Sequence, residues 1–291
     1  MRVTRHVDAQ GFVSQAGEFL GAREAEHNLI LGLTSRLERE PLLYGEPPYF
    51  AVAEDEGRVV GAAMRTPPHN LILSEIEEDA AVGLFAEDVR GVFDALPGVI
   101  GPKARVAQFA NAWRAATGAM PRLELAQRIF AADHVDEPRP TTGAIRDYEP
   151  AGDRQVAIRW MDEFVAEAMP ENAAHPESSA EFVDRREEDP EAGLVVWEDE
   201  LPVSMAGFGG RTPNGIRVGP VYTPPEQRGR GYASALVAEV SQAQLDSGRT
   251  FVFLFTDLAN PTSNRIYQAI GYEAVRDIDV YDYEGVEPAP S

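Results

Sequence analysis

The 291-residue sequence contains no cysteine. This absence excludes disulfides, thiolate metal sites and cysteine nucleophiles, and it is compatible with a reducing compartment. The five histidines do not provide a metal site either, because they lack the spacing that zinc sites show. They stand at positions His6, His27, His69, His134 and His175. We therefore expect a protein without a bound metal.

Positive charge is also scarce, with 26 Lys and Arg against 48 Asp and Glu and a net charge of −22. A surface this negative argues against binding to nucleic acid or anionic lipid. No apolar run is long enough to span a bilayer, and the first residues, MRVTRHVDAQGF, lack the apolar core of a secretion signal. We expect a cytoplasmic protein. The negative surface suits a cationic substrate, and charges that only keep the protein soluble explain it equally well.

The length leaves room for two domains, each large enough to bury a core. Residues 136–143, DEPRPTTG, are polar and rich in proline, which is typical of a linker. We therefore expect one domain at residues 1–135 and a second at 144–285. Residues 286–291 are predicted to form a disordered tail.

The two halves share a repeated pattern. Residues 50–67, FAVAEDEGRVVGAAMRTP, parallel residues 195–213, VVWEDELPVSMAGFGGRTP. Each segment is a predicted strand, an acidic turn, a second strand and then Arg-Thr-Pro, and a pair of predicted helices precedes each. Two copies of one fold explain this pattern, and a chance likeness between two acidic hairpins is the alternative.

The chemistry concentrates in residues 215–240, where a predicted strand, a glycine-rich loop and a helix follow one another. Gly229 and Gly231 can adopt positive φ and allow the main chain to approach a ligand. The unpaired N–H groups and positive dipole end of a helix from Tyr232 suit a phosphate, and Arg228 and Arg230 add positive charge. No Lys-Ser or Lys-Thr follows, which excludes a Walker loop. The dinucleotide glycine pattern fails at Ser234, and a simple strand-to-helix turn with solubilising arginines is the alternative.

A second informative stretch covers residues 250–275. A continuous apolar strand, Phe251–Phe255, precedes a predicted helix that carries Asn260, Ser263 and Tyr267 and ends at Gly271-Tyr272. With both stretches in this order, the chain resembles the GNAT acyl-CoA acyltransferase superfamily. The family's Arg/Gln-x-x-Gly-x-Gly/Ala loop corresponds to Arg228, Gly229, Arg230, Gly231, Tyr232 and Ala233. Its Asn-x-x-Ala/Ser-x-x-x-Tyr-x-x-x-Gly-Phe/Tyr motif corresponds to Asn260, Ser263, Tyr267, Gly271 and Tyr272.

The resemblance extends over about residues 145–283 and is weak before them. It implies an α/β fold with two GNAT-like domains, each a mixed, partly antiparallel sheet flanked by helices. In the first half, residues 74–85, SEIEEDAAVGLF, stand where the loop should fall, and their carboxylates would repel a diphosphate. That half is therefore predicted to be a degenerate, non-catalytic domain.

The resemblance also implies acetyl-CoA as the cofactor. The predicted strand Ile216–Thr223 contains Gly219-Pro220, and proline cannot donate to a sheet, so we expect a bulge or a gap in pairing there. In the family the strands part at this point and the pantetheine arm enters the gap. Carried over, its main-chain partners are Val221, Tyr222 and Thr223. A strained but empty edge is the alternative.

Tyr267 is the candidate general acid, because its phenol pKa of about 10 lies near that of a departing thiol. A tyrosine that only packs the helix is the alternative. Asn260 and Ser263 are candidate cofactor contacts, or else an N-cap and a first-turn residue. No general base is assigned. In the family, the helix whose end carries Glu163, Glu167 and Glu171 borders the acceptor site, and Asp257 lies at a predicted strand end. Solvated surface charges and a water relay are the alternatives to a carboxylate base.

These features predict an N-acetyltransferase that transfers an acetyl group from acetyl-CoA to a primary amine of a small-molecule or amino-acid-like acceptor. Transfer would occur by direct attack in a ternary complex. The alternatives are a non-catalytic acyl-CoA-binding sensor, which the missing base favours, and a protein that binds ATP phosphates with the same loop.

Overall fold

The computed structural model describes residues 1–168 and 178–283, which divide into two units. The first unit contains residues 1–127 and the strand residues from Arg276 onward, and the second contains Arg128–Val275. The expected boundaries at 135 and 144 differ from this division, because residues 128–143 belong to the second unit and residues 276–283 to the first. The expected tail, residues 286–291, lies outside the described residues.

Both units have the same order of elements. The first contains β1 (Arg2–His6), α1 (Ala9–Gly21), α2 (Asn28–Arg39), β2 (Tyr49–Asp55), β3 (Arg58–Arg65), β4 (Leu71–Leu73), α3 (Asp79–Arg90), β5 (Gly98–Pro102) and α4 (Lys103–Thr117), followed by β6 (Pro121–Ala132). The second contains β7 (Ala144–Asp147), α5 (Pro150–Ala168), α6 (Ser179–Glu188), β8 (Gly193–Asp199), β9 (Leu201–Gly209), β10 (Gly215–Tyr222), α7 (Tyr232–Asp246), β11 (Phe251–Asp257) and α8 (Pro261–Ala269), followed by β12 (Glu273–Tyr283). A single-turn helix, η1 (Pro225–Gln227), lies between β10 and α7.

The sheet of each unit is mixed, as the resemblance implied. The strand order is β1-β2-β3-β4-β5-β12 in the first unit and β6-β11-β10-β9-β8-β7 in the second. The parallel pairs are β4 with β5 and β10 with β11, while the β2–β3 and β8–β9 hairpins are antiparallel. These hairpins are the two repeated segments, so the repeat does reflect two copies of one topology.

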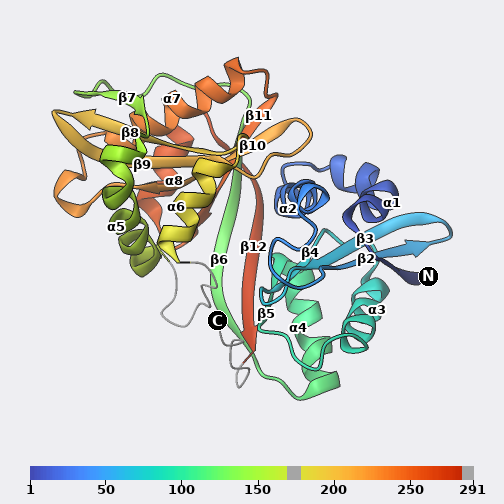
Figure 1. Ribbon diagram of the computed structural model, residues 1–291. Helices are drawn as coiled ribbons and strands as arrows, with labels where there is room; N and C mark the ends of the chain where they lie inside the picture. The colour runs from blue at the N-terminus through green and yellow to red at the C-terminus, as the bar shows by residue number, and fades with distance from the viewer. Residues whose placement is uncertain (169–177, 284–291) are drawn as a thin grey trace. The chain divides into compact units, whose positions relative to one another are not determined.

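Helices cover both faces of each sheet (Figure 1). In the first unit, α1 and α2 pack on one face around Phe12 and Phe50, and α3 and α4 pack on the other around Phe85 and Phe109. In the second unit, α7 packs through Leu236 against one face, and α5 and α6 pack on the other around Trp160 and Val183. These apolar faces explain the pattern, because each sheet face needs a helical layer to exclude water.

Local signals in the sequence explain where several helices begin. Asp8 accepts a hydrogen bond from the Gly11 N–H and caps α1. Ser178 and Glu181 form a capping box at the start of α6. No helix among the described residues is both long and apolar enough to cross a membrane.

Candidate active site in the second unit

The strands β10 and β11 are paired only at their beginnings. Gly215–Arg217 pair in parallel with Phe251–Phe253, and within the described residues no further pairs join the two strands. On its other side β10 follows β9, with a shift of register between Val218 and Val221. The bulge and the gap in pairing expected at Gly219-Pro220 are therefore both present.

Arg186, from α6, stabilises the bulge. Its Nη2 donates to the Gly219 carbonyl oxygen at 3.1 Å, and its Nη1 donates to the Phe208 carbonyl oxygen. The bulged segment leads directly into Val221, Tyr222 and Thr223, the residues expected to contact a pantetheine arm.

The glycine-rich loop has the backbone that an anion site requires. Gly229 and Gly231 have φ values of 77° and 90°. Gly231 is the N-cap of α7, and no side chain caps this helix end in the described structure. Arg228, Gly229 and Arg230 are exposed, so the loop is accessible to a ligand. Main-chain N–H groups at an uncapped helix start, beside two arginines, fit a diphosphate.

A second segment holds this loop in place. The Thr141 hydroxyl donates to the Arg230 carbonyl oxygen at 2.7 Å. The Thr142 hydroxyl and the Tyr232 hydroxyl both donate to Asp199 Oδ2, at 2.7 and 2.5 Å. Residues 141–142, expected only as linker, therefore anchor the loop and the first residue of α7. Thr141 and Asp199 had no recognisable signal in the sequence, because their partners lie 89 and 33 residues away.

Arg228 is oriented by two groups. Its Nε donates to the Thr223 carbonyl oxygen at 2.8 Å, and its Nη2 lies 2.9 and 2.7 Å from the two carboxylate oxygens of Glu167. The Tyr222 hydroxyl donates to the same carboxylate at 3.2 Å. The structure thus connects the loop, the end of β10 and the last turn of α5.

The end of β10 is held by Ser204. Its hydroxyl donates to the Tyr222 carbonyl oxygen at 3.0 Å and lies 2.8 Å from the Thr223 hydroxyl. Tyr222 itself is buried against Trp160, with ring centroids 6.5 Å apart. Burial, and then hydrogen bonding to Glu163 and the charge of Glu167, raise the pKa of Tyr222. The phenol of Tyr222 is therefore neutral at physiological pH.

Tyr267 lies in α8 and packs against the hydrophobic cluster that also contacts Val221. Burial raises the pKa of Tyr267 to about 12, so the phenol is protonated at neutral pH. A protonated phenol is the form that a general acid needs.

Asn260 caps α8, because its side-chain oxygen accepts a hydrogen bond from the Ser263 N–H at 3.1 Å. Ser263 lies in the first turn of α8. Asn260 is therefore the N-cap and Ser263 the first-turn residue that the sequence offered as the alternative. It does not prevent a cofactor contact, since each side chain keeps further hydrogen-bonding capacity.

The candidate carboxylates differ in their surroundings. Glu167 contacts the loop through Arg228, while Glu163 lies 4.0 Å from Arg159 on α5. Asp257 accepts a hydrogen bond from the Ala259 N–H at the end of β11. Glu171 lies outside the described residues. Among the described residues no cluster of His, Asp and Glu could hold a metal ion.

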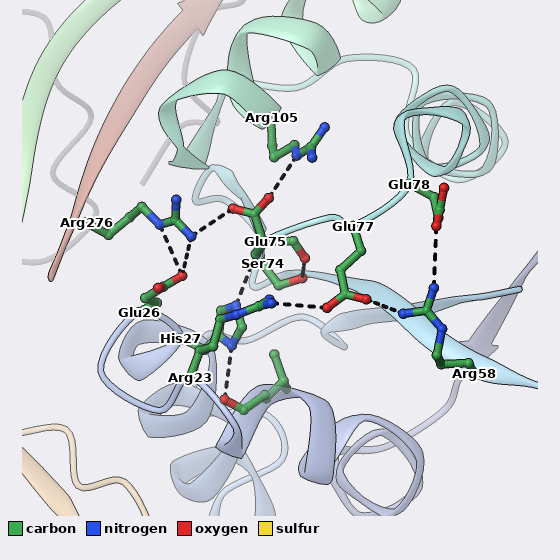
Figure 2. A network of polar contacts seen from close by, with 11 residues as sticks. Arg23, Glu26, His27, Arg58, Ser74, Glu75, Glu77, Glu78, Arg105 and Arg276 are labelled. Atoms are coloured by element: carbon green, nitrogen blue, oxygen red, sulfur yellow. Dashed lines mark hydrogen bonds and ion pairs between the residues drawn. The ribbon is translucent and has the colours of Figure 1, made fainter.

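The first unit has a different loop at the equivalent place, between β4 and α3 (Figure 2). Its carboxylates form ion pairs with arginines of the same unit. Arg23 contacts Glu77 at 3.1 Å, Arg105 contacts Glu75 at 3.0 Å, and Arg276 contacts Glu75 at 3.3 Å. Arg58 bridges Glu77 and Glu78. The site that holds positive charge in the second unit is thus occupied by paired carboxylates in the first.

Gly101 of β5 packs closely against β4 in the first unit. An ideal Cβ on Gly101 would lie only 2.6 Å from the Leu73 carbonyl oxygen. The paired carboxylates between β4 and α3 support the expectation that the first unit is a degenerate copy.

The fold and the site together define a protein of two α/β units, in which the second unit has an uncapped helix start and two strands that part after three paired residues. Residues 157–272 match the Acetyltransferase (GNAT) family model. This match confirms the resemblance over that part of the chain. No curated protein matches the chain.

Solved structures with the same fold cover nearly the whole chain. A GCN5-related N-acetyltransferase from Sphaerobacter thermophilus is 16% identical, with a TM-score of 0.59, over 89% of this chain and 88% of that one. A second, from Kribbella flavida, is 16% identical with a TM-score of 0.56, over 88% and 96%. A tandem GNAT protein from the clavulanic acid biosynthesis pathway is 14% identical with a TM-score of 0.55, over the full length of both chains. At these identities the likeness establishes the fold, and it includes both units.

Proposed function

We propose that the second unit is an N-acetyltransferase that transfers the acetyl group of acetyl-CoA to a primary amine of a small-molecule or amino-acid-like acceptor. The observation that carries this proposal is the uncapped start of α7 after Gly229 and Gly231, next to the point where β10 and β11 part. The uncapped helix start suits the diphosphate of CoA, and the parted strands leave main-chain groups of β10 for the pantetheine arm.

The cofactor-binding residues of this proposal are the expected ones: Val221, Tyr222, Thr223, Arg228, Gly229, Arg230, Gly231, Tyr232, Ala233, Asn260 and Ser263. The bound cofactor supplies an acetyl thioester. The Val221 N–H is the proposed donor to the carbonyl oxygen as negative charge develops on it. Tyr267 is the proposed donor of a proton to the departing sulfur.

The reaction is a direct attack in a ternary complex. The neutral amine nitrogen forms a bond to the carbonyl carbon, the carbon–sulfur bond breaks, and the sulfur leaves with the electron pair. The amine's surplus proton passes to water or a nearby carboxylate. The chain's lack of cysteine leaves no thiol for a covalent acetyl intermediate.

The absence of cysteine also makes the test sensitive. A thiol reagent reports only released CoA, because the protein has no thiol of its own. Purified protein with acetyl-CoA and a panel of primary amines should release thiol for at least one amine, and initial-rate lines should intersect. Parallel lines would exclude the ternary complex.

The alternative is an acyl-CoA-binding sensor. The sensor is favoured by the strand β10, GIRVGPVY, because this strand has no carboxylate to act as a base. Calorimetric CoA binding with no thiol release across the panel would support the sensor. Competition by ATP against CoA would indicate a nucleotide site instead.

A further inference from the structure

The ion pair between Arg228 and Glu167 places a carboxylate on the loop that the proposed function assigns to a diphosphate. Both oxygens of Glu167 lie within 3 Å of Arg228 Nη2. The two residues are 61 positions apart, so the packing of α5 beside β10 creates the contact. Glu167 therefore occupies, toward Arg228, the place that a phosphate oxygen would take.

This ion pair is easily exchanged. The side chains of Arg228 and Glu167 are 47% and 45% exposed, and such half-exposed pairs contribute little because water and salt screen them. A diphosphate carries more charge than one carboxylate and binds a guanidinium strongly. Arg228 also retains its bond to the Thr223 carbonyl oxygen, which holds its Nε in place while Nη2 changes partner.

Once Arg228 turns to a phosphate, Glu167 loses its cation. It still accepts the hydrogen bond from the Tyr222 hydroxyl at the end of β10. Glu163, one turn earlier on α5, adds a second negative charge near the same hydroxyl. Two carboxylates beside the parted strands then suit an ammonium group.

We propose that Glu167 is an exchangeable counter-ion: it neutralises Arg228 when the cofactor is absent, and it binds the ammonium group of the acceptor when the diphosphate has taken Arg228. This inference rests on the proposed function. It makes Glu167 a positioning residue for a cationic acceptor and couples the two substrates. Because coupling is reciprocal, bound CoA should strengthen acceptor binding by the same factor as acceptor strengthens CoA binding.

The test measures CoA affinity by calorimetry on the full chain for wild type and Glu167→Gln. The variant keeps the side-chain length but removes the charge that competes with phosphate. We expect CoA to bind about two- to fivefold more tightly, the range that corresponds to a surface ion pair. Asp184→Asn is the matched control, since Asp184 forms a similarly exposed pair with Arg154 that does not include a loop residue. The control should leave CoA affinity unchanged.

Acceptor binding should change in the opposite direction. For the primary amine with the highest turnover in the thiol-release panel, KM should rise about tenfold in Glu167→Gln, as expected for a lost charge-assisted hydrogen bond. A purely structural role for Glu167 would weaken both ligands together. Opposite changes in the two constants are therefore the signature of exchange.

A double-mutant cycle separates the pair from other effects. Arg228→Met should weaken CoA binding, and adding Glu167→Gln to it should produce no further tightening. Unchanged or weaker CoA binding in Glu167→Gln alone would overturn the exchange, and an unchanged amine KM would overturn the acceptor role. If wild type binds no CoA at all, the proposed function fails first, and the two failures are thereby distinguished.

Discussion

The rings of Tyr267 and Tyr272 lie 6.0 Å apart, centroid to centroid, with their planes tilted by 58°. The Tyr272 hydroxyl has a structural role, because it lies 2.7 Å from the Ser241 hydroxyl in the buried core. Tyr267 is only partly buried and packs against the same hydrophobic cluster. This pair offers a test of catalysis with an internal control.

Replacing Tyr267 by phenylalanine should lower kcat by about 10²–10⁴-fold, the contribution typical of a general acid. The CoA dissociation constant should remain near that of wild type, because the ring still packs. Stopped-flow or steady-state thiol release, together with calorimetry, gives both numbers. Tyr272→Phe should instead lower stability by about 1 kcal/mol, the value of one hydrogen bond, with little effect on kcat. Equal activity in Tyr267→Phe would remove Tyr267 from the mechanism.

The pH dependence of kcat follows from the raised pKa of Tyr267. Burial moves this pKa to about 12, so the folded protein keeps the phenolic proton throughout the range from pH 7 to 10. We expect no loss of kcat in that range. A basic limb near pH 10 that disappears in Tyr267→Phe would contradict this. An unfolded tyrosine ionises near pH 10, so burial of this phenol lowers the stability of the fold above that pH.

Thr141→Val should loosen the glycine-rich loop. The variant loses the hydrogen bond to the Arg230 carbonyl oxygen while keeping the shape of the side chain. We expect CoA to bind roughly three- to tenfold more weakly, since one hydrogen bond contributes about 0.5–1.5 kcal/mol, and kcat to change little. Thr117→Val in α4 is the matched control, because its hydroxyl also bonds a carbonyl oxygen at 2.7 Å but lies in the first unit.

Asp153 should be important for the stability of the second unit. It is 5% exposed, and it accepts hydrogen bonds from two nitrogens of Arg146, at 2.6 and 2.9 Å, and from the Glu149 N–H at 2.9 Å. Asp153→Asn should lower the free energy of unfolding by about 2–3 kcal/mol, as for other charged hydrogen bonds. Urea denaturation measures this loss.

Asp153 should also make the stability of the second unit depend on pH in the acid range. Hydrogen bonding to Arg146 holds the pKa of Asp153 below its usual value. Its stabilisation is therefore present above the unfolded pKa of about 4 and is lost as the pH falls through the lower folded pKa. The difference between wild type and Asp153→Asn should shrink in that acid range, and a constant difference would contradict the assignment.

Gly101→Ala should destabilise the first unit by about 2 kcal/mol or more, because overpacking and a disfavoured backbone both contribute. The added Cβ would meet the Leu73 carbonyl oxygen at 2.6 Å, and φ at this residue is 158°. Gly152→Ala in α5 is the control, since nothing lies within 4 Å of its Cβ. Thermal unfolding should show a lower midpoint only for Gly101→Ala.

Several features were readable in the order of residues because their causes are local. Positive φ at Gly229 and Gly231 and the interruption of pairing at Gly219-Pro220 depend on neighbours within a few positions. The acidic character of residues 74–85 could be read in the same way. The family resemblance, which depends on two local motifs, implied the fold class, and the repeated hairpins indicated two copies of one topology.

The short strands β1 and β5 could not be predicted from local sequence. The strand β5, GVIGP, has two glycines and a proline in five residues, and β1, RVTRH, is mostly polar. Each is held by its neighbours rather than by its own propensity. The placement of residues 276–283 with the first unit also had no local sign, since it depends on antiparallel pairing of β12 with β5.

The partners of the loop residues were decided by tertiary structure alone. Nothing near Arg228 in the sequence points to Glu167, and nothing near Arg230 points to Thr141. A main-chain conformation is set by the residue itself and its neighbours, but an ion pair or hydrogen bond across 61 or 89 residues exists only when packed helices and strands bring the two groups together. The backbone of the glycine-rich loop is therefore encoded locally, and the contacts of Arg228 with Glu167 and of Arg230 with Thr141 arise from the packing of the second unit.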